Sequence, residues 1–146
     1  MPKKILVLCT GNSCRSQIAE GYLKHFAGDR ALVYSAGVET HGVNPRAVQV
    51  MKEDGIDISH HNSKSVDTFT GQEFDYVITV CDNAKGQCPV FPGTTKRIHW
   101  SFADPAAAEG DDELRLAVFR KVRDEILQRL RLFVDAVASS GKLREE

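Results

Sequence analysis

The sequence predicts an α/β fold, a small doubly wound sheet of four parallel strands in the order 2-1-3-4 flanked by helices. Short apolar runs rich in β-branched residues alternate with longer segments whose apolar residues recur at helical spacing. Such alternation is typical of βαβ units joined by right-handed crossovers. The 146 residues are enough for one hydrophobic core and too few for two, so we expect 1–146 to form a single domain.

The first half of the chain contains two expected strands and two expected helices. In order, these are a strand at Lys3–Leu8, a loop at 9–15, a helix at Ser16–Phe26, a strand at Ala31–Ala36 and a helix from Asn44-Pro45 to about Asp54. Each strand is a short apolar run that a Gly-containing segment ends. The second helix has proline in its first turn and Gly55 after its end, which are both preferred positions.

The second half repeats the alternation. The expected elements are a short helix or turn at Asp67–Gln72, a strand at Phe74–Val80, a long loop at Cys81–Gly93, a strand at Lys96–Trp100 and a helix at Asp111–Ala138. The run "FDYVITV" predicts a buried strand, and the loop after it is polar and contains Gly and Pro. The last helix has a continuous apolar stripe, which indicates packing against the sheet.

Composition narrows the class of function. Nineteen basic residues nearly balance twenty acidic ones, for a net charge of −1, so no global basic field favours nucleic acid or an anionic membrane as partner. No apolar run is long enough to cross a bilayer. The apolar run 5–8 is too short for the core of a signal peptide. We therefore expect a cytoplasmic protein that binds neither nucleic acid nor membrane.

The chain has four cysteines, at positions 9, 14, 81 and 88. A secreted disulfide framework is disfavoured because no signal peptide precedes them. Structural zinc is disfavoured because the spacings are not of the CxxC type and no histidine stands near them in a ligand pattern. We expect no metal, and catalytic or redox-active thiols instead.

The segment "CTGNSCRS", residues 9–16, predicts an oxyanion site. A loop that leads from a strand into a helix turns its backbone N–H groups inward, where the helix N-terminus adds partial positive charge. The expected oxyanion-binding residues are Thr10, Gly11, Asn12, Ser13, Cys14 and Arg15. Gly11 and Asn12 are the residues best able to adopt positive φ, and Arg15 supplies a planar fork of donors.

Cys9 lies at the foot of this loop. The field of the loop favours a thiolate, so we expect a lowered pKa for Cys9, and Ser16 can donate a hydrogen bond to that thiolate. Cys81 also follows a strand directly, and the carboxyl ends of parallel strands meet at one edge of a sheet. Cys9 and Cys81 are therefore expected at the same edge, where Cys9 would attack a bound tetrahedral oxyanion.

Three segments carry a resemblance to a known family. "CTGNSCRSQ" resembles the phosphate-binding loop of low-molecular-weight protein tyrosine phosphatases, and still more that of the thioredoxin-coupled arsenate reductases of the same fold. "HWSFADPA" at 99–106 resembles the Asp-Pro loop of both groups, and "VCDNAKGQCP" at 80–89 resembles the redox segment of the reductases only. The resemblance implies Cys9 as nucleophile and Asp104 as the acid that protonates the leaving oxygen.

The resemblance to the reductases further implies a thiol relay. Cys81 would attack the sulfur of a Cys9–arsenate adduct, and Cys88 would then attack Cys81, which moves the disulfide outward to a thioredoxin. Arsenate would be the substrate, with phosphate or sulfate as competing oxyanions, and no organic cofactor would be needed. A monomer is expected.

Two alternatives remain open. A phosphotyrosine or small-phosphoester phosphatase would share Cys9, Arg15 and Asp104. Such a phosphatase usually has a tyrosine beside the Asp-Pro pair, whereas Ala106, Ala107 and Ala108 follow here. A non-catalytic oxyanion-binding module would need an unreactive Cys9.

Some of these reductases hold a potassium ion beside the loop. By the resemblance, its ligands would be Asn12, Glu20 and Ser35, but Lys64 stands where a further acidic ligand is expected. We expect the Lys64 ammonium to neutralise Glu20 in place of the ion. His60 and His61 are interpreted as exposed or capping residues.

Overall fold

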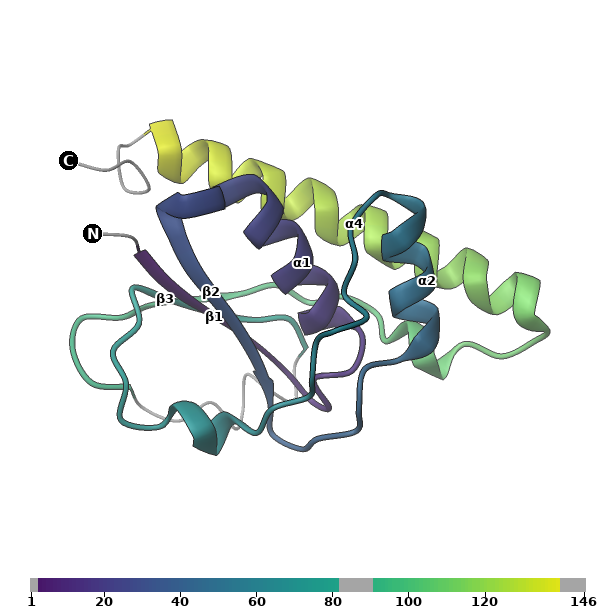
Figure 1. The fold of residues 1–146 in the computed structure, drawn as a ribbon, viewed down its shortest axis with the longest axis horizontal. Helices are drawn as coiled ribbons and strands as arrows, with labels where there is room; N and C mark the ends of the chain where they lie inside the picture. The colour runs from purple at the N-terminus through teal and green to yellow at the C-terminus, as the bar shows by residue number, and fades with distance from the viewer. Residues whose placement is uncertain (1–2, 82–90, 140–146) are drawn as a thin grey trace.

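The computed structural model describes residues 3–81 and 91–139. Four strands form one sheet (Figure 1), and every pair of neighbours is parallel. They are β1 Lys3–Cys9, β2 Ala31–Gly37, β3 Tyr76–Thr79 and β4 Lys96–His99. Their order is β2-β1-β3-β4, so the predicted topology is confirmed.

Three α-helices of the described chain pack together along the sheet (Figure 1). They are α1 Arg15–Ala27, α2 Pro45–Glu53 and α4 Asp112–Ser139. Short 3-10 turns lie at Gly28–Arg30, Val66–Phe69 and Pro105–Ala107, labelled η1, η2 and η3. The helix predicted at 44–54 is confirmed: the Asn44 side chain caps it by accepting from the Arg46 N–H at 2.8 Å, and Gly55 follows it with φ +79°.

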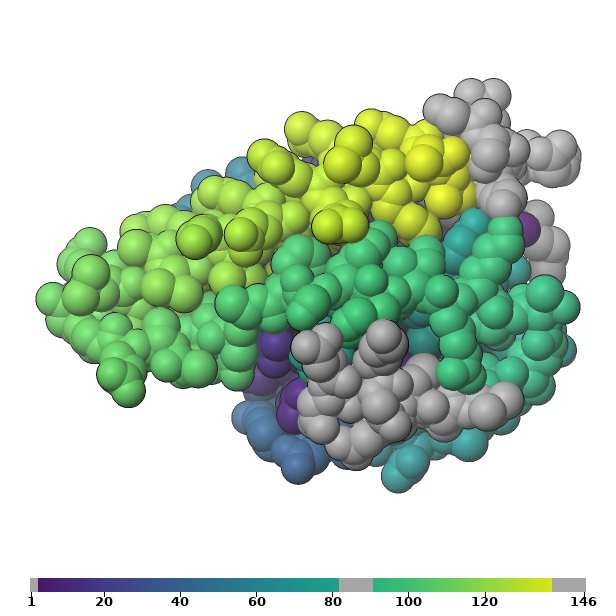
Figure 2. Space-filling model, turned by 180° about the vertical axis from the view of Figure 1, so that it is seen from behind, coloured from purple at the N-terminus to yellow at the C-terminus, as the bar shows by residue number. Residues whose placement is uncertain are grey.

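The centre of the sheet is the most buried part of the described chain. Ile5, Leu6, Val7 and Leu8 in β1 are each 0% exposed, as expected for a parallel strand with neighbours on both sides and both faces covered. Seen from behind, α4 runs in light green to yellow beside the green segment that contains β4 (Figure 2). Phe133 of α4 seals that contact, because its ring packs edge-on against both Tyr76 and Trp100.

The described helices do not include one long and apolar enough to span a membrane. The boundaries of the predicted elements shift by one or two residues at most places. The largest changes are in the short helix or turn predicted at 67–72, where η2 is Val66–Phe69, and in β3, which is limited to Tyr76–Thr79.

Candidate active site

Cys9 and Cys81 lie at one edge of the sheet, as predicted. Cys9 is the last residue of β1, and the register of β1 with β3 pairs Leu8 with Thr79. The strands remain bonded past that point, since the N–H of Val80 donates to the Leu8 carbonyl at 2.9 Å. The Cys81 sulfur is hydrogen-bonded to the Cys9 thiol and lies 3.2 Å from Thr10 Oγ1. Parallel pairing thus places two thiols from distant parts of the chain in contact.

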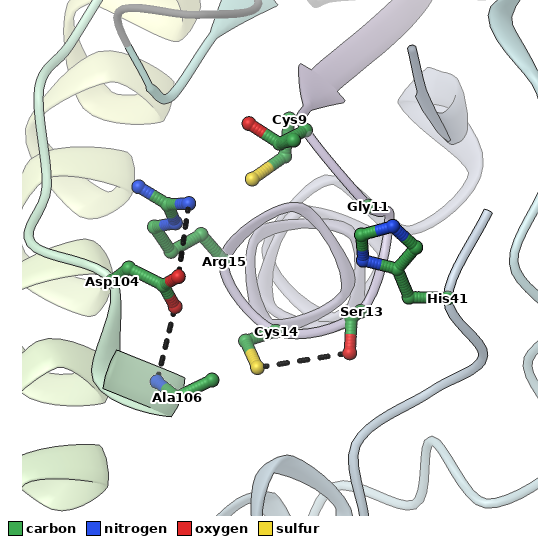
Figure 3. Close-up of a pocket in the computed structure, with 9 residues that line it drawn as sticks. Cys9, Gly11, Ser13, Cys14, Arg15, His41, Asp104 and Ala106 are labelled. Atoms are coloured by element: carbon green, nitrogen blue, oxygen red, sulfur yellow. Dashed lines mark hydrogen bonds and ion pairs between the residues drawn. The ribbon is translucent and has the colours of Figure 1, made fainter. Parts of the chain in front are cut away.

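The loop after β1 encloses a cavity of about 160 Å³ at this edge (Figure 3). It is lined by Cys9, Thr10, Gly11, Ser13, Cys14, Arg15, His41, Asp104 and Ala106. Pockets for drug-sized ligands are usually at least about 300 Å³, so this one suits a small tetrahedral oxyanion. No Phe, Tyr or Trp is among the described lining residues, in keeping with the small pocket mouth predicted from Ala106–Ala108.

Arg15 holds its guanidinium over the cavity. Its Nη1 donates to the Phe102 carbonyl at 3.0 Å, and Nη2 lies 3.9 Å from the Asp104 carboxylate. The Nε atom is buried and has no hydrogen-bond partner in the described chain. A buried donor without a partner costs about 1–3 kcal/mol, so Arg15 is fixed in place with spare donor capacity for an anion.

The conformation of the loop depends on two close backbone approaches. Asn12 has φ +49°, as predicted. The prediction of a positive φ at Gly11 is wrong. Glycine is needed there for a different reason, since a Cβ would lie 2.5 Å from His41 Nδ1. A Cβ at Gly37 would lie 2.7 Å from the Asn12 nitrogen and 2.8 Å from the Thr10 carbonyl oxygen, so the end of β2 supports the loop directly.

Asn12 supports the cavity from beneath instead of lining it. It is 0% exposed, and its side-chain NH₂ donates to Ser16 Oγ and Ser35 Oγ, both at 2.8 Å. Its Oδ1 accepts from the Lys64 N–H at 2.8 Å and from Gln17 Nε2 at 3.0 Å. The Asn12 side chain therefore supports the loop from inside the protein, and the oxyanion role predicted for Asn12 stays a prediction.

The prediction of a lowered pKa for Cys9 is also wrong in this geometry. The hydrogen bond to Cys81 and burial raise the pKa of Cys9 well above its ordinary value, and they outweigh the guanidinium of Arg15 and the Thr10 N–H, which lower it. The sequence argument counted the field of the loop but not the neighbouring thiol. Burial also raises the pKa of Cys14 to about 11, which disfavours its thiolate.

Asp104 borders the cavity, whereas Ser16 is not among its lining residues. Ser16 Oγ is fully buried and accepts from Asn12, which leaves its hydroxyl hydrogen free of that bond, and donation to Cys9 stays a prediction. Asp104 caps η3 by accepting from the Ala106 N–H at 3.0 Å, and its half-exposed carboxylate borders the cavity. Cys88 lies outside the described residues.

The oxygens expected to bind potassium are committed to other partners. Asn12 Oδ1 accepts two hydrogen bonds, as above, and Glu20 accepts hydrogen bonds from Ser35 Oγ and Lys24 Nζ. Lys64 Nζ lies 3.9 Å from Glu20 Oε1 and donates to the Asn62 carbonyl at 2.7 Å. This cluster already contains its own cation, so the residues do not fit a potassium ion.

Burial and partners set the charges in the same cluster. Burial raises the pKa of Glu20, but the hydrogen bonds from Lys24 and Ser35 and the nearby His61 outweigh it and hold that pKa below its ordinary value. For Lys64, burial lowers the pKa while Glu20 opposes the change. The charge of the Glu20 carboxylate is thus stabilised by neighbouring protein cations and not by solvent.

Sequence reasoning missed three supporting residues. His61 was expected to be exposed, but its side chain is 5% exposed and its Nδ1 lies 2.9 Å from Gln17 Oε1. Gln17 in turn donates to Asn12 and to the Asn62 carbonyl. His41 was not singled out at all, since nothing in its local sequence shows that the segment after β2 turns back over Gly11.

Comparison with known proteins gives consistent matches along the chain. Residues 4–143 match the family of low molecular weight phosphotyrosine protein phosphatases. The chain is 54% identical over 136 residues to an arsenate reductase of Halalkalibacterium halodurans, covering 92% of this chain and 98% of that one. It is 52% identical over 133 residues to an arsenate reductase of Bacillus subtilis, covering 91% and 96%.

Solved structures give the same result. An arsenate reductase in a phosphate-binding state superimposes with a TM-score of 0.72 at 32% identity, over 92% of this chain and 98% of that one. A thioredoxin-dependent arsenate reductase of Corynebacterium glutamicum gives a TM-score of 0.74 at 28% identity, over 95% of this chain and 63% of that one.

Proposed function

Since the chain belongs to the arsenate reductases within the low-molecular-weight phosphotyrosine protein phosphatase family, we propose that it reduces arsenate to arsenite with thioredoxin as reductant. The observation that carries the proposal is the contact between the Cys9 and Cys81 thiols at the edge of an oxyanion-sized cavity. A phosphatase needs only the first of these thiols, whereas a reductase needs a second one within reach.

The reaction begins with arsenate in the cavity, its oxygens bound by Arg15 and by the N–H groups of the loop. An oxygen of the bound arsenate takes the proton of the Cys9 thiol, which leaves a Cys9 thiolate beside the guanidinium. The thiolate attacks arsenic, and an arsenate oxygen leaves as water after Asp104 protonates it. The product is a covalent Cys9–arsenic adduct in which arsenic is still pentavalent.

The redox step transfers two electrons. Cys81 attacks the Cys9 sulfur and its thiol proton passes to an oxygen of the arsenic group. The sulfur–arsenic bond breaks, and its electron pair stays on arsenic, which leaves as arsenite. A Cys9–Cys81 disulfide remains. Cys88, by the resemblance, then attacks Cys81 and releases the Cys9 thiolate, and thioredoxin reduces the Cys81–Cys88 disulfide. No organic cofactor takes part.

We further propose that Lys64 acts as a fixed cation beneath the loop, where it neutralises Glu20 in place of a metal. Residues 1–146 would act as one monomeric domain in the cytoplasm, where a reducing environment keeps the relay thiols available. Phosphate and sulfate would compete for the same cavity.

The relay is tested by single-turnover and steady-state assays with thioredoxin, its reductase and NADPH. Cys9→Ser should abolish arsenate reduction and any aryl phosphate hydrolysis. Cys81→Ser should stop at the adduct and release little arsenite. Cys88→Ser should complete one reduction and stall as a Cys9–Cys81 disulfide, which mass spectrometry of a non-reducing digest detects.

Two outcomes would overturn this assignment. Continued turnover by Cys88→Ser with thioredoxin would mean that Cys88 does not resolve the disulfide. Rapid hydrolysis of aryl phosphates by the unaltered protein, without arsenite formation from arsenate, would favour the phosphatase. Aryl phosphate hydrolysis serves as the matched control, since it uses Cys9, Arg15 and Asp104 but neither of the other two thiols.

A further inference from the structure

The segment after β2 forms a second wall of the cavity. Its backbone is tied to the loop at three successive points: Val38 N–H donates to the Cys9 carbonyl at 3.2 Å, Glu39 N–H to the Thr10 carbonyl at 2.8 Å, and His41 N–H to the Gly11 carbonyl at 3.1 Å. These bonds fix where the His41 side chain begins. The backbone of this wall is therefore fixed relative to the loop.

The His41 ring lies across the cavity from Arg15 and Asp104, with one edge turned toward the space between them (Figure 3). Its Nε2 atom is 2.8 Å from Glu39 Oε2. A carboxylate can only accept, so Nε2 carries the hydrogen. In the neutral imidazole the other nitrogen, Nδ1, then has a free lone pair, and this is the ring atom that lies nearest to Gly11.

This lone pair differs from most of the cavity. Arg15 and the N–H groups of the loop offer hydrogens, and they bind any tetrahedral oxyanion without regard to its protonation. An acceptor at the cavity wall binds only an oxyanion that carries a hydroxyl group. Near neutral pH arsenate and phosphate are mixtures of monoanion and dianion, and both forms carry at least one hydroxyl. Sulfate has none, and the dianion of a phosphate monoester has an ester oxygen in its place.

On the basis of the proposed function, we propose that His41 determines which class of oxyanion the cavity binds. Glu39 orients the His41 ring, and Nδ1 accepts the hydroxyl hydrogen of an oxyanion that carries one. This hydrogen bond favours arsenate and phosphate over sulfate and phosphate monoesters. Glu39 acts as a positioning residue, because it fixes the tautomer and does not touch the anion. The charged and titratable groups around His41 are Glu39, Asp104, Arg15, Cys9 and Cys14.

The experiment measures binding of inorganic phosphate and of sulfate to the reduced full chain by isothermal titration calorimetry at pH 7.5. His41→Phe keeps a ring over Gly11 but removes the acceptor. Loss of one hydrogen bond at about 1.4 kcal/mol corresponds to a factor of ten. The ratio of the sulfate Kd to the phosphate Kd should therefore fall about tenfold, chiefly through weaker phosphate binding. His25→Phe, at an exposed position on α1, is the matched control and should leave the ratio unchanged.

Glu39→Gln provides a second readout. Its amide NH₂ can donate to Nε2 and move the ring hydrogen to Nδ1, so the ratio should fall although the ring stays in place and the melting temperature is unchanged.

An unchanged ratio in both His41→Phe and Glu39→Gln would overturn the inference. These measurements involve no thiol chemistry, so they test the role of His41 separately from the proposed reductase function. A chain that does not reduce arsenate but shows the His41-dependent ratio contradicts only the reductase assignment. A working reductase with an unchanged ratio contradicts only the role of His41.

Discussion

Replacement of Asn12 by alanine should destabilise the protein more than any other single change in the loop that leaves the cysteines intact. Asn12 makes the four side-chain hydrogen bonds described above, to Ser16, Ser35, Gln17 and the Lys64 N–H, and all are inside the protein. At about 1 kcal/mol each, their loss costs about 4 kcal/mol. Alanine at φ +49° adds about 1 kcal/mol.

The total is about 5 kcal/mol, which for a chain of this size lowers Tm by roughly 10–20 °C. Thermal unfolding followed by circular dichroism measures this shift. Asn12→Gly separates the two contributions, because glycine tolerates positive φ and should recover about 1 kcal/mol relative to alanine. Asn62→Ala, at an exposed position two residues before Lys64, is the matched control and should stay within about 0.5 kcal/mol.

The same variants report on the cavity. Saturating phosphate at 100 times its Kd should stabilise the unaltered protein by about 2.7 kcal/mol, and this gain should be much smaller in Asn12→Ala because the loop loses its support. If Asn12→Ala unfolds within about 1.5 kcal/mol of the unaltered protein and still gains fully from phosphate, the supporting role of Asn12 is refuted.

Three further predictions concern the same framework. Potassium should change Tm and activity no more than matched sodium, whereas Lys64→Asp should introduce a potassium dependence; specific stabilisation of the unaltered protein by potassium would contradict this. Gly37→Ala should lower the free energy of unfolding by about 1–3 kcal/mol and weaken phosphate binding, because the nearest atoms to its new Cβ are backbone atoms. Gly21→Ala places its Cβ against the flexible end of the Met51 side chain and should cost less. Burial lowers the pKa of His61 despite Glu20, so stability should decrease as the pH falls below about 6.5, and His61→Gln should flatten that part of a Tm-against-pH curve.

The fold and the arrangement of the cysteines could be predicted because they depend on local patterns. Apolar runs and helix caps placed the strands and helices, and the rule that parallel strands share a carboxyl edge brought Cys9 and Cys81 together. The order of the strands was predicted as that of a small doubly wound sheet with right-handed crossovers. Each of these inferences needs only neighbouring residues and a general rule of topology.

The errors concern contacts between segments far apart in the chain. Gly11 was assigned to a backbone conformation, whereas the His41 ring occupies the place of its side chain. The supporting role of the Asn12 side chain was missed because the side chains that surround it, from β2 and from the segment near Lys64, could not be located from sequence. His61 was placed at the surface for the same reason.

The raised pKa of Cys9 connects these errors to the chemistry. The guanidinium of Arg15 and the Thr10 N–H of this loop favour a Cys9 thiolate, whereas burial opposes it. Here a second thiol lies in hydrogen-bond contact with Cys9, and that contact is the largest cause of the raised pKa. The same contact is the one that a disulfide between Cys9 and Cys81 requires. The site therefore keeps the reducing thiol within bonding reach of Cys9 at the expense of the acidity of the Cys9 thiol. A phosphatase has no reason to accept that cost, so the position of Cys81 favours reduction over hydrolysis independently of any resemblance in sequence.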